Sequence, residues 1–454
     1  MIESTLMQAA NTLQANLRGA DAAFRGVSTD TRSLSSGELF VALQGPNFDG
    51  AVFASKAEEA GAAGIVVQTD VDTSLPSIKV DNARMALGRL AAEWRAQLPT
   101  TVIGVTGSNG KTTLKELIAS CLNPVSSTLA TQGNLNNDIG LPLMLLRLSG
   151  EHRFAVLEMG ANHAGEIAYL TSLAMPSIVV ISNAGPAHLE GFGSIDGVAH
   201  AKGEILQGSP RPVTAVLNAD DQYFDLWSTM ADDLAIVSFG YSESATVRVL
   251  NVKSGAESSA FDLQLPGARI SVELPLPGAH NILNACAAAA VVHAAGLTPA
   301  QIRNGLQSAR PVEGRLRPVA GVRGLRLFDD TYNANPASVV AAAKYIAAQD
   351  GTSWMVLGDM GELGADAINM HRAVGEEIRK AGVARLLATG ELSQHAVDAF
   401  GINGAWYDSV ESLIAELQAS ANGAANVLVK GSRTMRMERV VTALRSDSEA
   451  AGRH

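Results

Sequence analysis

The sequence predicts an α/β fold in several domains, built around a central P-loop-type, mostly parallel sheet with helices on both faces. Three observations predict it. A glycine-rich loop stands between an apolar β-branched run and a helical segment. Buried-looking strands alternate with helical patterns over most of the chain. Finally, 454 residues exceed what one hydrophobic core usually organises.

The first part of the chain, residues 1–84, reads as a small N-terminal α/β domain. Strands are predicted at 39–43, 64–67 and 78–80, with a helix at 53–60. Two polar segments, STDTR and SGELFVALQGPNFDG, look functional, although the second could equally form only a tight turn. The candidate binding residues in them are Ser28, Thr29, Asp30, Arg32, Asn47 and Asp49.

The loop GVTGSNGKTT opens the predicted central domain, residues 85–313. Its glycines allow backbone N–H groups to turn toward an anion at the start of the following helix. Lys111 would reach the β- and γ-phosphates, and Thr112 would offer its hydroxyl to Mg²⁺. Val105 stands where the strict motif has its first glycine, but a simple turn leaves the Gly-Lys-Thr order unexplained. We therefore expect a nucleoside triphosphate site formed by Gly107, Ser108, Asn109, Gly110, Lys111, Thr112 and Thr113.

The rest of the central domain alternates strands with helices. After a helix at 83–97 and a strand at 101–103, strands are predicted at 154–157, 178–182, 213–217 and 235–239. The polar-apolar alternation of 245–274 indicates an antiparallel appendage. Helices at 281–295 and up to about 308 complete the domain.

Residues 314–454 read as a Rossmann-like C-terminal α/β domain. Strands are predicted at 325–328, 354–357, 385–389 and 427–429, and a hinge at 311–315. Residues 445–454 read as a frayed tail.

Chemically suggestive side chains follow the central strands, where open parallel sheets bind ligands. Glu158 comes directly after the strand 154–157, as a Mg²⁺ ligand would. A cap or a salt bridge is the alternative role. His188 lies in the next loop, where a structural hydrogen bond is a more common role for a lone histidine than metal binding. Lys202 alone would be read as a solvated helix residue.

Composition excludes several classes of protein. A formal net charge of −11 opposes binding to a nucleic-acid backbone. No apolar run approaches the length of a membrane helix, and the first 20 residues lack the apolar core of a signal peptide, so we expect a cytoplasmic protein without stable membrane insertion. Cys121 and Cys286 lie far apart without neighbours at metal-binding spacing and are expected to be core residues.

A series of motifs in order along nearly the whole chain resembles the Mur ligases of peptidoglycan synthesis. They are TGSNGKTT, TQGNLNND, LEMG, NAGPAH, AKGEI, PGAHNILNACAAAA, GRL, DDTYNANP, GDMGELG and KGSRTMRME. DDTYNANP and GDMGELG resemble the member that adds D-alanyl-D-alanine to UDP-N-acetylmuramoyl-tripeptide. The sister enzyme that adds the third amino acid usually carries Asp-Asn-Pro-Arg in its last domain, and this sequence has only DNAR at 81–84, in the wrong domain.

The resemblance implies three domains, for the UDP-sugar, for ATP and for a C-terminal lid that binds the dipeptide. It implies an acyl-phosphate intermediate and two Mg²⁺ sites. Separately, we expect a monomer. Lys111, Glu158, His188, Lys202 and Arg315 would be catalytic, and Thr112, Glu158, His188 and a carbamate on Lys202 would hold metal. Nucleotide would contact the loop residues together with Asn281, Asn284, Arg315, Asp330 and Asn333. The two substrates would contact the N-terminal candidates named above and Thr131, Asn134, Asn137, Asn335, Lys430 and Arg433.

Other functions stay open at this point. One is a related ligase, either the sister that adds the third amino acid or a folylpolyglutamate synthetase. Another is a nucleotide-binding switch without chemistry, which would keep the loop around Lys111 but would need neither His188 nor Lys202. Because Arg315 and Asp330 lie beyond the predicted hinge, we also expect the complete site to form only when the C-terminal domain swings in.

Overall fold

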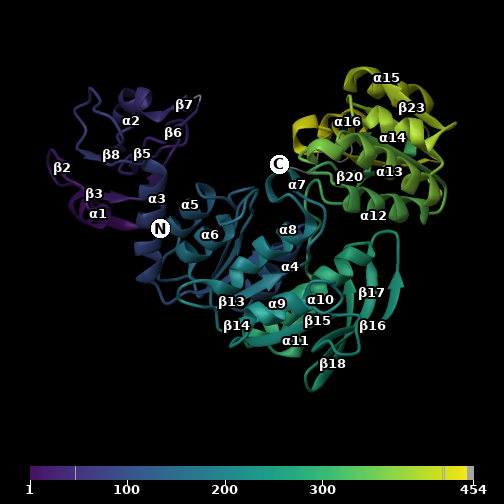
Figure 1. The fold of residues 1–454 in the computed structure, drawn as a ribbon, viewed down its shortest axis with the longest axis horizontal. Helices are drawn as coiled ribbons and strands as arrows, with labels where there is room; N and C mark the ends of the chain where they lie inside the picture. The colour runs from purple at the N-terminus through teal and green to yellow at the C-terminus, as the bar shows by residue number, and fades with distance from the viewer. Residues whose placement is uncertain (47, 422, 424, 447–454) are drawn as a thin grey trace.

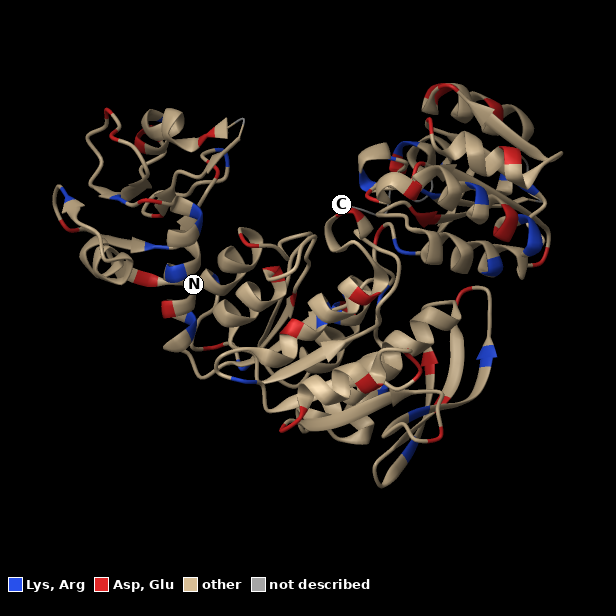
Figure 2. Ribbon diagram, viewed as in Figure 1, with Lys and Arg blue, Asp and Glu red and all other residues tan. Residues whose placement is uncertain are grey.

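The computed structural model describes residues 1–46, 48–421, 423 and 425–446. Three larger sheets, of five, nine and six strands, follow one another along the chain. The N-terminal and C-terminal parts lie at opposite ends of the central part (Figure 1). Lys and Arg are interspersed with Asp and Glu in all three parts (Figure 2). No helix among the described residues is both long and apolar enough to span a membrane.

The N-terminal part contains a five-stranded sheet in the order β2-β9-β8-β5-β4. Its strands β4, β5, β8 and β9 are parallel, and β2 is antiparallel to β9. The predicted strand 64–67 is β8, and the other predicted boundaries are off by only one or two residues. The elements are β1 (Glu3–Thr5), α1 (Leu6–Leu13), β2 (Leu17–Arg18), β3 (Ala23–Arg25), β4 (Val27–Ser28), β5 (Leu39–Val41), β6 (Gln44–Gly45), β7 (Phe48–Asp49), η1 (Gly50–Phe53), α2 (Ala54–Glu59), β8 (Gly64–Val67) and β9 (Ser77–Lys79).

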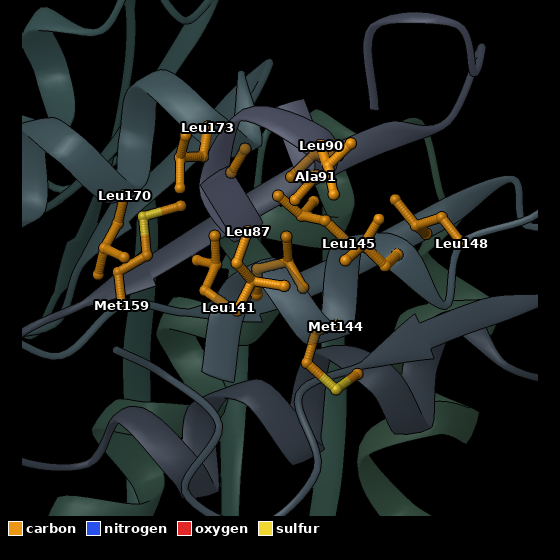
Figure 3. Packing of buried hydrophobic residues seen from close by; sticks show 14 of the residues in the cluster. Leu87, Leu90, Ala91, Leu141, Met144, Leu145, Leu148, Met159, Leu170 and Leu173 are labelled. Atoms are coloured by element: carbon orange, nitrogen blue, oxygen red, sulfur yellow. The ribbon is translucent and has the colours of Figure 1, made fainter. Parts of the chain in front are cut away.

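Helix α3 (Ala83–Ala96) joins the N-terminal part to the central part. It begins where the Asn82 side chain accepts a hydrogen bond from the backbone N–H of Met85. Leu87, Leu90 and Ala91 of α3 pack with the leucines of α5 (Gly140–Leu146), as Figure 3 shows. The same apolar cluster includes buried residues of α1, β5 and β8, so it extends across the predicted boundary between residues 84 and 85.

The central sheet has the strand order β11-β12-β10-β13-β14-β15-β16-β17-β18. Pairing is parallel from β11 to β16 and antiparallel from β16 to β18, which confirms the predicted antiparallel segment. That segment is not a separate appendage, because β15 pairs with β16 and extends the same sheet. The strands are β10 (Thr101–Thr106), β11 (Thr128–Ala130), β12 (Phe154–Glu158), β13 (Ile178–Ile181), β14 (Thr214–Asn218), β15 (Ala235–Gly240), β16 (Val247–Ser254), β17 (Ser259–Leu265) and β18 (Ala268–Leu274).

Alternate residues of the central strands enter two separate cores. Ala155 and Leu157 belong to the cluster shared with α3, whereas Phe154 and Val156 pack with α4 (Lys111–Leu122) and α10 (Ala279–Ala294). Strands buried on both faces in this way are expected of a parallel sheet covered by helices. The remaining helices are α6 (Glu166–Ala174), α7 (Leu189–Phe192), α8 (Ile195–Gly203), η2 (Glu204–Gln207), α9 (Phe224–Ala231) and α11 (Pro299–Gln307).

The C-terminal sheet has the order β19-β20-β24-β21-β22-β23 and is parallel except for β19. Its strands are β19 (Arg317–Ala320), β20 (Arg326–Asp330), β21 (Thr352–Gly358), β22 (Arg385–Thr389), β23 (Gly404–Tyr407) and β24 (Ala425–Lys430). Its helices are η3 (Val322–Gly324), α12 (Pro336–Ala347), η4 (Gly364–Asp366), α13 (Ala367–Lys380), α14 (Ser393–Phe400), α15 (Val410–Ser420), η5 (Arg433–Met435) and α16 (Glu438–Leu444).

The predicted frayed tail begins too early. Arg445 forms a β-bridge with Gly321, and the Ser446 N–H donates a 2.9 Å hydrogen bond to the carbonyl of Ala320. Backbone pairing therefore continues to residue 446, and the rest of the predicted tail, 447–454, lies outside the described residues.

Candidate active site

The predicted phosphate loop connects β10 to α4. Gly107 (φ +147°) and Gly110 (φ +82°) adopt backbone conformations that L side chains rarely take. At Gly107 a Cβ would also lie only 2.0 Å from Oγ of Ser182. Gly110 is the N-cap residue of α4, and no side chain of the described chain caps this helix, so its first N–H groups can bind an anion.

Asn183, which the sequence did not single out, holds this loop in place. Its carbonyl accepts a 3.0 Å hydrogen bond from the Ser108 N–H, and its Oδ1 accepts a 2.9 Å bond from the Asn109 N–H. Lys111 folds back so that Nζ donates a 2.7 Å bond to the carbonyl of Gly107. Burial lowers the pKa of Lys111; the Glu158 charge opposes this effect and the Arg315 charge reinforces it.

Glu158 is the last residue of β12 rather than the first residue after it, and it is 3% exposed. Both carboxylate oxygens accept hydrogen bonds: Oε2 from Thr112 Oγ1 at 3.0 Å and Oε1 from Asn136 Nδ2 at 2.8 Å. Thr131, a predicted substrate residue, is also buried, and its Oγ1 accepts a 2.9 Å bond from the Glu158 N–H. The carboxylate is thus fixed from several sides beside the phosphate loop.

Asn136 was not among the residues predicted from the sequence, although it lies in the same TQGNLNND motif as the predicted Asn134 and Asn137. All three asparagines line the main cavity. Oδ1 of Asn137 accepts a 2.9 Å bond from the Gly140 N–H where α5 begins. The motif alone does not say which asparagine reaches the carboxylate, because that depends on the turn of the loop.

His188 and Lys202 lie on the loop and helix that follow β13. His188 has a left-handed backbone (φ +53°), and its Nδ1 lies 2.5 Å from Oε2 of Glu362 in the C-terminal part. Lys202 is 1% exposed in α8, so it is not a solvated helix residue, and its Nζ lies 5.4 Å from the centroid of the Phe192 ring. Burial, reinforced by the charge of Lys111, lowers the pKa of Lys202 to about 7.

The C-terminal part reaches the phosphate loop through two side chains. Arg315 Nη2 donates a 3.3 Å bond to Thr112 Oγ1, and the guanidinium carbon lies 4.0 Å from the centroid of the Tyr332 ring. Nε of Arg315 is buried without a hydrogen-bond partner among the described residues. Nδ2 of Asn335 donates a 2.7 Å bond to Oδ1 of Asn109.

A buried ion pair lies behind these contacts. Lys430 Nζ donates a 2.7 Å bond to Asp330 Oδ2 and a 2.9 Å bond to the carbonyl of Asn333. Asp330 and Lys430 line a cavity of about 230 Å³ with Asn281, Asn284 and Thr113, predicted nucleotide residues that lie far apart in the sequence.

The cavity called the main cavity here, because most of the predicted site residues line it, has a volume of about 360 Å³ and opens between the central and C-terminal sheets. Most of its walls are polar side chains and backbone of both parts. The predicted residues that line it are Ser108, Asn109, Gly110, Lys111, Asn134, Asn137, Glu158, His188, Arg315, Asn333, Asn335, Lys430 and Arg433. Thr112 lines an adjoining cavity on the other side of Arg315.

The described N-terminal candidates do not line this cavity: Ser28 ends β4, Thr29, Asp30 and Arg32 follow it, and Asp49 ends β7. Arg32 hydrogen-bonds to Asp30 and lowers the pKa of Asp30 to about 2. Ser28 Oγ donates a 3.0 Å bond to the Asp30 carbonyl, and Asp49 Oδ1 accepts a 2.9 Å bond from the Ala51 N–H. Thr29 lies in the same turn, and Asn47 lies outside the described residues. The roles of these residues toward a substrate stay predictions.

Fold and site together define an α/β enzyme with a phosphate loop, whose candidate active site lies between a central and a C-terminal sheet. Family models match most of the chain: "Mur ligase family, catalytic domain" at residues 23–95, "Mur ligase middle domain" at 105–292 and "Mur ligase, glutamate ligase domain" at 314–433. The chain belongs to the Mur ligase family.

Individual relatives agree with this assignment. The chain is 42% identical to the UDP-N-acetylmuramoyl-tripeptide--D-alanyl-D-alanine ligase of Escherichia coli (strain K12), over 98% of this chain and 99% of that protein. Among solved structures it is similar to MurF from Acinetobacter baumannii, with a TM-score of 0.91, 34% identity and coverage of 97% and 98% of the two chains. MurF ligase from Thermotoga maritima, solved in complex with ADP, has a TM-score of 0.82 at 28% identity, with coverage of 92% and 96%.

Proposed function

We propose that this enzyme uses ATP to join D-alanyl-D-alanine to UDP-N-acetylmuramoyl-tripeptide, which gives the UDP-muramoyl-pentapeptide precursor of peptidoglycan. The observation that carries the proposal is the meeting of Lys111, Glu158 and Arg315 at one cavity between two sheets. The 42% identity to a ligase of this name over 98% of the chain supports the choice of substrates. The ADP in the related Thermotoga maritima structure supports ATP as the nucleotide.

Magnesium fits the residues present. No cluster of three or more His, Cys, Asp or Glu side chains among the described residues could hold a metal ion by itself. Thr112 and Glu158 nevertheless offer a hydroxyl and a carboxylate 3.0 Å apart, and such hard oxygen ligands are those with which Mg²⁺ bridges a protein to phosphate groups. His188 would contribute to a second site. When bound, Mg²⁺ would offset the negative charge of the reacting phosphate oxygens.

A carbamate on Lys202 would supply the oxygen ligand that this set lacks. A pKa of about 7 leaves a large fraction of the amine uncharged at neutral pH, and the uncharged amine is the form that attacks CO₂. The new N–C bond converts the amine into a carbamate anion with release of one proton. This chemistry would also explain why a lysine that is 1% exposed lies near the cationic Lys111.

The proposed ligation takes place in two successive reactions, and different residues would act in each. In the first, an oxygen of the tripeptide carboxylate attacks the γ-phosphorus of ATP. The bond between the γ-phosphorus and the oxygen that bridges it to the β-phosphate breaks. The products are ADP and an acyl phosphate on the tripeptide. Lys111, the α4 N-terminus and Arg315 would hold and neutralise the phosphates, because two anions must meet in line. The nucleoside would bind in the cavity of about 230 Å³, where it would contact Asn281, Asn284 and Asp330.

In the second reaction the dipeptide amine attacks the acyl carbon and forms a tetrahedral intermediate. The carbon–oxygen bond to phosphate then breaks, phosphate leaves, and the nitrogen loses a proton to give the amide. Asn335, Lys430 and Arg433 would bind the dipeptide side, and Asn134 and Asn137 the tripeptide side. Thr131 would act through Glu158. The UDP-sugar would lie on the N-terminal sheet near Ser28, Thr29, Asp30, Arg32, Asn47 and Asp49.

We propose further that the enzyme works as a monomer in the cytoplasm, with small-molecule substrates and without nucleic acid. The net charge of −11 and the interspersed charges (Figure 2) argue against a polyanionic partner.

The test is a phosphate-release assay across UDP-muramoyl peptides and amine acceptors, with the product mass measured. Release is expected only when ATP, UDP-N-acetylmuramoyl-tripeptide and D-alanyl-D-alanine are present together. Release on UDP-muramoyl dipeptide with a single amino acid would favour the sister enzyme. Glutamate addition to a folate would favour a folylpolyglutamate synthetase, and bound ADP without release on any substrate would favour a switch.

A further inference from the structure

Two loops from different sheets meet at the main cavity. One follows β13 and carries His188, and the other follows β21 and carries Glu362. Both residues have left-handed backbones, with φ +53° at His188 and φ +60° at Glu362, which non-glycine residues seldom adopt. Close packing continues beside them, because a Cβ built on Gly364 would lie 3.7 Å from Cα of Glu190.

The side chains of these two residues form a contact between the central and C-terminal parts. Nδ1 of His188 lies 2.5 Å from Oε2 of Glu362, and the two side chains are 24% and 56% exposed. A half-exposed contact of this kind adds little to stability, so stability alone does not account for two left-handed residues facing each other here.

The contact engages one specific nitrogen of the imidazole. With Nδ1 directed to a carboxylate, Nε2 is the nitrogen left to act as a ligand. A histidine that binds metal through one nitrogen commonly donates the other N–H to a carboxylate, which fixes the tautomer and the orientation of the ring. In this chain the carboxylate comes from the opposite side of the cavity.

We infer that Glu362 is a positioning residue that orients His188 for metal binding, and that it does so only while the C-terminal part is docked on the central part. This inference rests on the proposed function. It makes metal binding at His188 depend on docking, because the residue that orients the ring belongs to the C-terminal part. Glu362 itself does not bind the metal.

The experiment measures Mn²⁺ binding to the full-length enzyme at saturating ADP, by electron paramagnetic resonance. The variants are His188→Ala, Glu362→Ala, Glu362→Gln and the double variant. His188→Ala identifies the affinity class that depends on the imidazole. Glu362→Ala should weaken that class about 10- to 100-fold, and Glu362→Gln should weaken it less, since the amide oxygen still accepts a hydrogen bond. ADP binding without metal should not change in either Glu362 variant.

The double variant separates positioning from direct ligation. If Glu362 acts only through His188, the double variant should bind Mn²⁺ no more weakly than His188→Ala alone. A further loss in the double variant would mean that Glu362 is itself a ligand and would overturn the inference. Unchanged Mn²⁺ binding by Glu362→Ala would overturn it as well.

Controls separate this inference from the proposed function and from misfolding. Glu376 on α13 carries an exposed carboxylate of the same domain, so Glu376→Ala should bind Mn²⁺ like the wild type. Each variant should match the wild type in urea unfolding. If wild-type enzyme releases phosphate with its substrates while Glu362→Ala binds Mn²⁺ normally, only the inference about Glu362 fails. If wild-type enzyme shows no metal-dependent ligation, the proposed function fails first.

Discussion

Asn335, at the start of α12, donates a 2.7 Å hydrogen bond from Nδ2 to Oδ1 of Asn109 in the phosphate loop. The same Asn335 side chain caps α12, because its Oδ1 accepts a 2.9 Å bond from the Ser338 N–H. One residue thus starts a helix of the C-terminal part and holds that part against the nucleotide loop.

These two roles of Asn335 can be separated by substitution. Asn335→Ser keeps a good helix cap but is too short to reach Asn109, so unfolding free energy should stay within a few tenths of a kcal/mol of wild type while the KM for ATP rises. Asn335→Ala loses the cap as well and should cost about 1 kcal/mol. Urea unfolding and steady-state kinetics measure both quantities. Equal destabilisation by the two variants would contradict the separation.

Lys111 is the cation of the phosphate loop closest to the expected phosphoryl transfer. Lys111→Ala should lower turnover by orders of magnitude and leave the fold intact, because neutralisation of phosphate charge is most of the catalysis in such reactions. Phosphate release with a circular dichroism control checks this expectation. A folded variant with near-normal ligation would rule out the assignment of the loop.

Substitution of Lys202 tests whether this residue carries a carbamate that takes part in catalysis. Lys202→Ala should be nearly inactive, and short-chain carboxylic acids should restore part of the activity by supplying the missing oxygen ligand. The exposed Lys380 offers a control, since Lys380→Ala should be active and should not respond to the acids. Full activity of Lys202→Ala would show that the amine has no part in catalysis, whereas failure of rescue alone would be weaker evidence.

The two buried cysteines should make the stability of the protein depend on pH in the alkaline range. Burial raises the pKa of Cys121 and of Cys286 from 9.0 to about 12, so the native protein keeps both thiols protonated over a range in which the unfolded chain loses those protons. Their contribution to stability is therefore fully present below pH 9 and decreases as the pH rises toward 12. At pH 8 a disulfide reagent should modify them only after unfolding, and rapid modification of the native enzyme would contradict their burial.

Domain closure can be followed by small-angle X-ray scattering. Arg315, Asp330 and Lys430 follow the predicted hinge at 311–315, whereas the phosphate loop precedes it, so ATP together with the UDP-sugar peptide should reduce the radius of gyration. An unchanged radius at saturating ligand, with activity intact, would mean that the site is preassembled and that the hinge is misplaced.

The sequence predicted the strands that are buried on both faces, because continuous β-branched and apolar runs such as those of β8 and β22 leave few alternatives. It did not predict β19, which contains Pro318, or β23, whose Trp406 is 38% exposed at the edge of the sheet. Both strands lie at edges of the sheet, and most of their side chains are half-buried or exposed, so neither shows a continuous apolar run.

The candidate site divides in a similar way. Lys111 and Thr112 follow from a local motif, and Glu158 from its place at a strand end. Asn136 and Asn183 could not be predicted, because their hydrogen bonds depend on how two loops fold beside each other. The contact between His188 and Glu362 joins loops that only the packing of two sheets brings together.

The two outer parts of the molecule are attached to the centre in different ways. Helices α1, α3 and α5 share one apolar cluster, whereas the buried clusters of the C-terminal sheet comprise only residues from Leu316 to Leu444 among those described. Among the described residues, a buried apolar cluster thus crosses the first junction but not the second. With the UDP-sugar held on the N-terminal sheet, as proposed, the distance from that sheet to the phosphate loop would determine which peptide stems can react. Only a stem of matching length would place its carboxylate in reach of Lys111. The junction between the first two parts would therefore select substrates by stem length before the C-terminal part closes.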